Sequence, residues 1–134
     1  MIDNLPEQLA TPENTMTTIH WMLLLAGVLM SAVGGLFLKI GAVQIQYDSG
    51  SVDIIRQVLF NWKIIAGVMM YFIPVLIWIF LLKSVDLSFL QPLFSMVYVV
   101  TPVLASIVLS ESVTPARWLG IATIIVGVVI VARS

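Results

Sequence analysis

Four long runs of apolar residues, separated by short polar segments, make up most of this chain. Each run supplies the ~20 apolar residues that a helix needs to cross ~30 Å of hydrocarbon. We therefore predict membrane spans at about 18–42, 60–83, 88–110 and 114–133. Because a helix satisfies its own backbone hydrogen bonds in lipid, the predicted fold class is an all-α membrane protein, a four-transmembrane-helix bundle with both termini on one side.

The segment before the first apolar run, residues 1–16, is acidic and shows no apolar periodicity. It carries Asp3, Glu7 and Glu13 but no Lys or Arg. A secretory signal peptide begins with a positive segment, so we expect the first run to be a retained helix and not a cleaved signal. The predicted organisation is a flexible N-terminal tail over 1–16 and one transmembrane domain over 17–134.

The first connection, residues 43–59, is the longest of the three and has a pattern of its own. Its stretch 47–50 (Tyr-Asp-Ser-Gly) is typical of a turn, and Ser51 is expected to cap a following helix. After it, apolar and polar positions separate onto two helical faces, with Ile54 on one and Asp53 on the other. This pattern predicts either a short interfacial helix or a simple N-terminal extension of the second span.

Composition and charge support a membrane protein. With 60% hydrophobic and only 10% charged residues, the chain has too little polar surface to coat a water-soluble globule. It has no cysteine, which excludes disulfides and thiolate metal sites. Four of the six basic residues lie with the first and third connections, and under the positive-inside rule this favours termini outside the cytoplasm.

The first span combines small residues with one charge. Gly27, Ser31 and Gly35 recur four apart, with Gly34 beside them, and plain helix packing explains this spacing because backbones can approach closely there. Lys39, near the end of the span, differs in kind. Its ammonium must either snorkel to the headgroups or pair with an anion, and the functional interpretation is contact with a phosphate group.

Polar and aromatic side chains form a stripe in each of the two middle spans. The stripes consist of Gly67, Tyr71, Pro74 and Trp78 in the second span and of Gln91, Ser95, Tyr98, Pro102 and Ser106 in the third. Such a stripe normally faces the bundle or a wet cavity, and prolines in it remove helical hydrogen bonds and kink the span. Ordinary packing explains either stripe alone; together they favour a cavity with apolar walls and a few polar groups.

The fourth span and the connection before it carry two further patterns. Gly120 and Gly127 are seven apart and share one face, which predicts a helix-association surface within one chain or between two. Glu111 is expected to lie at the interface or to pair with a nearby base. Thr114 and Pro115 are typical of a helix N-cap and first turn.

No group of residues is placed for catalysis. The chain has one His, no Cys, no glycine-rich phosphate loop and no pair of acids spaced for acid–base work. We therefore expect no enzyme activity, no cofactor, no metal site and no nucleic-acid partner. Transport, lipid handling or a structural role in a membrane complex remain.

The last span resembles the final-helix signature of the drug/metabolite transporter superfamily. The stretch that carries the resemblance is Glu111-Ser-Val-Thr-Pro-Ala-Arg-Trp-Leu-Gly-Ile-Ala-Thr-Ile-Ile-Val-Gly-Val-Val-Ile. With four spans, the chain is similar to the small multidrug resistance branch and to EamA-like proteins. Drug exporters of that branch carry a Glu in the first span eight residues before a Lys. Eight residues before Lys39 this chain has Ser31, so the proton-coupling acid is absent.

Three segments look closer to the paired small subunits of 4-amino-4-deoxy-L-arabinose-phosphoundecaprenol flippases. They are Ser31-Ala-Val-Gly-Gly-Leu-Phe-Leu-Lys39, Leu93-Phe-Ser-Met-Val-Tyr-Val and Val113-Thr-Pro-Ala-Arg-Trp-Leu-Gly. The resemblance implies a transporter that moves a sugar on a polyprenyl phosphate across the bacterial inner membrane. It also implies a homo- or heterodimer of four-helix subunits, an undecaprenyl-phosphate-type glycolipid as substrate and the lipid bilayer as surroundings.

A substrate site follows as a hypothesis. An anionic headgroup needs a cation for its phosphate, which we assign to Lys39, and polar contacts for the rest. The remaining candidate substrate-binding residues are Ser31, Tyr71, Trp78, Gln91, Ser95 and Tyr98. The alternatives are a small-metabolite or drug exporter of the small multidrug resistance type and a non-transporting structural subunit.

Overall fold

The structure is a computed structural model that describes residues 16–134. Its elements are α2 (Thr18–Val43), the 3₁₀ turn η1 (Tyr47–Ser49), α3 (Ser51–Phe60), α4 (Trp62–Leu82), α5 (Leu87–Phe94), α6 (Val97–Val108) and α7 (Pro115–Arg133). Four stretches are long and apolar enough to cross a membrane, α5 and α6 together forming one of them. The predicted fold class is therefore confirmed. The predicted tail over 1–16 lies, apart from Met16, outside the described residues.

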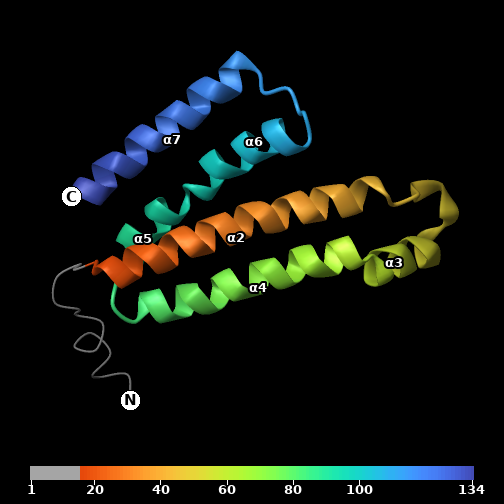
Figure 1. Cartoon of the computed structure of the whole chain (residues 1–134), viewed down its shortest axis with the longest axis horizontal. Coiled ribbons are helices and arrows are strands. Elements are labelled where there is room, and N and C mark those ends of the chain that lie inside the picture. The colour runs from red at the N-terminus through yellow and green to blue at the C-terminus, as the bar shows by residue number, and fades with distance from the viewer. Residues whose placement is uncertain (1–15) are drawn as a thin grey trace.

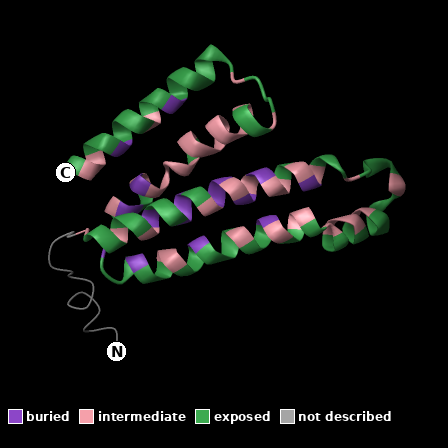
Figure 2. Cartoon of the chain, in the orientation of Figure 1, coloured by how far each residue is buried: buried purple, intermediate pink, exposed green. Residues whose placement is uncertain are grey.

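The spans lie side by side in an open row (Figure 1). The helix α2 packs along α4 on one side and against α6 on the other, while α7 packs on α5 and α6. Figure 2 shows buried residues concentrated on α2, with most of α4 and α7 exposed. The outer helices present large apolar side chains such as Phe72 and Ile130, as surfaces facing lipid do.

The contact between α2 and α4 depends on two glycines. A Cβ placed on Gly67 would lie 2.9 Å from the carbonyl oxygen of Gly34, and one on Gly34 would lie 3.1 Å from that of Gly67. The two backbones can approach this closely only because neither residue has a side chain. A Cβ on Gly41 would likewise meet Ile64 at 2.5 Å, so small residues line the α2–α4 contact towards its far end too.

The apolar core lies at the other end of the row, where all four spans meet. One buried cluster is formed by Leu24 of α2, Leu81 near the end of α4, Val85 between α4 and α5, Leu90 and Leu93 of α5, and Val128 of α7. These side chains connect the α2–α4 pair to the α5–α7 pair. At this end the row is held by packing, whereas towards the α6–α7 connection it opens.

The first connection forms a separate helix and not an extension of the second span. The backbone of Asn61 is extended (φ −83°, ψ 108°), which ends α3 and starts α4, and its Oδ1 accepts a hydrogen bond from the N–H of Lys63 at 3.0 Å. The prediction that Ser51 caps α3 was wrong. Gly50, with φ +81°, occupies the N-cap position, and Ser51 is the first helical residue. Glycine adopts this backbone conformation without the steric cost that a Cβ brings.

The third span was predicted as one segment over 88–110, but it is two helices. After Phe94 the backbone forms i→i−3 hydrogen bonds, from Met96 N–H to Leu93 O at 3.2 Å and from Tyr98 N–H to Ser95 O at 2.8 Å. Pro92 has no N–H to donate, so it removes one hydrogen bond within α5. The N–H and the hydroxyl of Ser95 both donate to the carbonyl of Pro92, and the chain turns at 95–96 before α6 begins.

Candidate functional site

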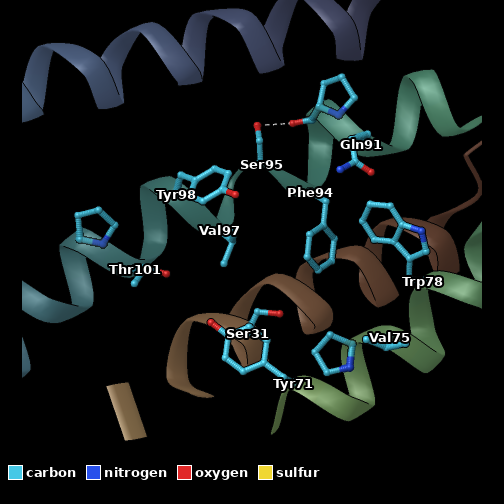
Figure 3. A pocket seen from close by; sticks show the side chains of 13 residues that line it. Ser31, Tyr71, Val75, Trp78, Gln91, Phe94, Ser95, Val97, Tyr98 and Thr101 are labelled. Carbon is cyan, nitrogen blue, oxygen red and sulfur yellow. Dashed lines mark hydrogen bonds between the residues drawn. The ribbon is translucent and has the colours of Figure 1, made fainter. Parts of the chain in front are cut away.

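A cavity of about 930 Å³ lies between α2 and α4 on one side and α5 and α6 on the other. Figure 3 shows side chains from all of these helices around this space. The seven predicted substrate-binding residues divide clearly, because six of them line the cavity and Lys39 does not. The six are Ser31, Tyr71, Trp78, Gln91, Ser95 and Tyr98. Their role in binding stays a prediction, whereas their proximity is a property of the fold.

Each wall of the cavity is positioned by a local feature of the chain. On α4, Tyr71 and Trp78 are seven residues apart and therefore share a face. The small Gly35 of α2 leaves room for the Tyr71 hydroxyl, which would lie 3.3 Å from a Cβ there. On the opposite wall, the turn at 95–96 separates Gln91 from Tyr98 and widens the space between them.

The polar groups in the cavity are mostly available to a ligand. Among residues 16–134, the side chains of Ser31, Tyr71, Gln91 and Tyr98 have no hydrogen-bond partner, and Ser31 is only 3% exposed. Ser95 is the exception, since its hydroxyl donates to the carbonyl of Pro92 (Figure 3). Hydroxyls and an amide can both donate and accept, so the cavity suits a ligand rich in hydroxyl groups.

Aromatic rings supply much of the remaining surface. The rings of Trp78 and Phe94 meet edge to face with centroids 4.9 Å apart. Among residues 16–134, no charged side chain lines this cavity. Hydroxyl and amide groups beside exposed aromatic faces, without charge, are chemically suited to a neutral sugar, which has both C–H and O–H surfaces.

Four lining residues were missed from the sequence, namely Val75, Phe94, Val97 and Thr101. Thr101 lies three residues after Tyr98 and could have been found by its helical spacing. Phe94 lies three residues after Gln91 and four before Tyr98, on the same helical face, but it is apolar and was not counted in a polar stripe. Conversely, Ser106 was placed on that stripe but does not line the cavity, and its hydroxyl donates to the carbonyl of Val103 within α6.

Lys39 lies at a neighbouring charged site. Its Nζ is 3.5 Å from Oε1 of Glu111, and the two side chains are 55% and 44% exposed. The prediction that Glu111 pairs with a nearby base is thereby confirmed. Glu111 and Arg117 line a second cavity of about 440 Å³ between α6, α7 and their connection. Thr101 and Pro102 line both cavities, so the two are adjacent.

The predicted helix-association glycines fall into two groups. Gly27, Gly34 and Gly35 face neighbouring helices, with a Cβ on Gly27 3.2 Å from the ring of Phe94. Gly120 and Gly127 have nothing within 4 Å of a Cβ. Within the described chain the α7 glycines therefore make no close helix contact. Of the two predicted possibilities, association with a second chain remains a prediction.

Comparison with known proteins agrees with this arrangement. Residues 7–133 match the profile of the EamA-like transporter family. The probable 4-amino-4-deoxy-L-arabinose-phosphoundecaprenol flippase subunit ArnE of Proteus mirabilis is 30% identical over 114 residues, which are 85% of this chain and 97% of the relative. The protein of the same name from Pseudomonas savastanoi is 26% identical over the same shares of both chains. No solved structure matches the chain.

Proposed function

Because this multi-pass membrane protein belongs to the EamA-like transporter family, we propose that it is one subunit of a flippase for a polyprenyl-phosphate-linked sugar. We propose the bacterial inner membrane as its location, because both relatives are bacterial proteins named as flippase subunits for a sugar linked to phosphoundecaprenol. A transporter and not an enzyme is what the family and the relatives' names indicate.

The observation that carries the proposal is the chemistry of the 930 Å³ cavity. Its free hydroxyls, amide and aromatic faces are suited to a sugar, and it lies within an open row of helices. A polyprenyl tail can stay in the bilayer beside such a row while the headgroup enters between the helices. The cationic Lys39 pairs with Glu111, which lines the second cavity, and this cavity shares Thr101 and Pro102 with the larger one; this supports a phosphate site next to the sugar.

The missing acid distinguishes this site from that of a cation exporter. Neither Asp nor Glu lines the larger cavity, and the position eight residues before Lys39 is the buried Ser31. A buried carboxylate would hold a cation or a proton, but it would repel a phosphate. The same absence leads us to expect an uncharged sugar, because the ammonium of an amino sugar would find no carboxylate in this lining.

The test is reconstitution in liposomes with a fluorescent polyprenyl-phosphate sugar, followed by a chemical quencher that reaches only the outer leaflet. Without exchange, only the probe in the outer leaflet is quenched. We expect the quenched fraction to rise above this value as probe from the inner leaflet is exchanged, for this chain alone or together with a second four-span subunit. A neutral-sugar probe should exchange faster than its amino-sugar counterpart. A probe that stays in its original leaflet under both conditions contradicts the flippase.

A substitution in the first span tests the role of charge. Ser31→Glu should slow exchange at least about tenfold, because like charges ~8 Å apart at an effective dielectric constant of ~20 repel by ~2 kcal/mol. Ser31→Gln is the matched control, since it adds the same volume without charge. Equal losses in the two variants would show that size, and not charge, excludes an acid from this position.

A further inference from the structure

Three charged side chains lie around the connection from α6 to α7. Lys39 and Glu111 form the ion pair, and Arg117 lines the second cavity together with Glu111. Arg117 has no ion-pair partner among residues 16–134. The group therefore holds two cations and one anion, and it carries one excess positive charge beside a cavity of about 440 Å³.

The backbone holds Glu111 opposite α2. Ser110 has a positive φ of 55°, which turns the chain sharply after α6, and the N–H of Glu111 donates to the carbonyl of Ala105 at 3.4 Å. At the other end of the connection, the Thr114 hydroxyl accepts from the N–H of Arg117 at 3.4 Å and caps α7, as predicted. Both ends of this short segment are thus tied to helices.

The ion pair itself is exchangeable. Its two side chains are about half exposed and their charged atoms are 3.5 Å apart, so solvent screens the attraction and the pair is weak. A phosphate carries more charge than a carboxylate and offers more acceptor oxygens. Glu111 connects the two cations, since it pairs with Lys39 and lines the second cavity together with Arg117. A phosphate ligand would replace Glu111 as the partner of Lys39.

We propose that the second cavity binds the phosphate of the transported lipid and that Glu111 is a built-in competitor for that phosphate. In the empty protein the Glu111 carboxylate pairs with Lys39. When substrate enters, its phosphate displaces the Glu111 carboxylate and binds Lys39 and Arg117. The shared lining by Thr101 and Pro102 allows a sugar in the larger cavity and its phosphate in the smaller one. The competitor lowers the affinity, which permits release after transport. The identity of the lipid rests on the proposed function, but the anion site can be tested without transport.

The test measures binding of decaprenyl phosphate to the full chain in phosphatidylcholine nanodiscs, followed by tryptophan fluorescence. Lys39→Gln and Arg117→Gln should each raise the apparent Kd about fivefold or more, because each removes a cation from the phosphate. Glu111→Gln should lower it about three- to fivefold, since it removes a weak competitor. In a Lys39→Gln background, Glu111→Gln should gain less, because no ion pair remains to be displaced.

Matched controls separate this site from general electrostatic attraction. Lys83→Gln and Arg133→Gln remove one positive charge each that neither lines a cavity nor pairs with Glu111, and they should leave the Kd unchanged. Decaprenol, which lacks the phosphate, should show none of these dependences. Inorganic phosphate binding as tightly as decaprenyl phosphate would identify a site for a soluble anion and overturn the lipid assignment.

Two further outcomes overturn the proposal. One is a Glu111→Gln variant that binds decaprenyl phosphate no more tightly than the wild type while its melting temperature is unchanged. The other is full exchange activity in the Lys39→Gln, Arg117→Gln double variant, which would leave the flippase intact and remove this site. If instead exchange is absent in the wild type but the Kd values follow the expected order, the phosphate site stands and the flippase falls.

Discussion

At the scale of single residues, the absence of a side chain decides how closely α2 and α4 approach. Gly34 and Gly67 face each other, and a Cβ on Gly67 would lie 2.8 Å from Cγ of Leu38 as well as 2.9 Å from a backbone oxygen. A flexible side chain can move aside, but the backbone of a packed helix cannot do so without shifting the helix. This contact therefore sets the distance between α2 and α4, which together form one wall of the larger cavity.

Gly67→Ala should accordingly destabilise the protein. We expect a loss of about 1–3 kcal/mol, the usual cost of overfilling a packed contact. The measurement is the free energy of unfolding in mixed detergent micelles, followed by circular dichroism. Gly127→Ala is the control, because nothing lies within 4 Å of a Cβ there. Equal stability of the two variants would contradict the close approach of α2 to α4.

The residue scale also separates two positions that the family resemblance treats together. Ser31 and Lys39 are eight residues apart on one helix, a rise of about 12 Å. Ser31 lies in the larger cavity, whereas Lys39 lies at the charged site beside the smaller one. A headgroup that contacts both must extend along α2, as a sugar joined to a phosphate does.

At the scale of elements, side-chain hydrogen bonds fix the first connection. The helix α3 is tied to the turn before it by the side chain of Gln57. Its Oε1 accepts from the N–H of Gln46 at 2.8 Å, and its Nε2 donates to the hydroxyl of Ser49 at 2.9 Å. One side chain thus orders the passage from α2 into α3.

Gln57→Ala should loosen this connection without unfolding the spans. Each lost hydrogen bond contributes about 0.5–1.5 kcal/mol, so amide exchange at Gln46 should accelerate by about tenfold or more. Hydrogen exchange followed by mass spectrometry measures this in nanodiscs. Gln44→Ala serves as the control, because the Gln44 side chain makes no hydrogen bond within the described residues. Unchanged exchange in Gln57→Ala would mean that other contacts order the turn.

At the scale of the whole molecule, the open row leaves much of the outer helix α7 exposed, although α7 packs on α5 and α6. No atom of the described chain lies within 4 Å of a Cβ at Gly120 or Gly127, and Gly120 borders the second cavity. Four helices in a row do not surround a headgroup, so a second four-helix subunit, identical or different, completes the passage in the proposed transporter.

Gly127→Leu should weaken this association while leaving the fold intact. The larger side chain separates helices that meet at a glycine, whereas within the described chain a Cβ at this position has nothing within 4 Å. The apparent affinity between labelled chains in liposomes, measured by energy transfer, should fall about tenfold. The melting temperature followed by circular dichroism should stay unchanged. Val126→Leu, on a neighbouring exposed face of α7, is the control. Equal energy transfer in both variants would place the interface elsewhere.

Much of this protein is decided locally, and local features can be read from the order of residues. The spans follow from apolar runs, since hydrocarbon requires a continuous apolar helix, and the cap of α7 follows from Thr114 and Pro115. Helical periodicity likewise predicted six residues of the larger cavity, because residues on one face of a helix must point the same way. The missing acid in the first span was evident for the same reason.

Contacts between distant parts of the chain depended on packing. The open row, the break at 95–96 and the pairing of Lys39 with Glu111 depend on how the helices pack, which no pattern within one helix specifies. Packing placed Lys39, the candidate phosphate-binding residue, outside the larger cavity proposed for the sugar, and it paired Lys39 with the carboxylate of Glu111. The acid absent from the first span is thus replaced by one in the last connection, which faces the same cation from outside the membrane's apolar core.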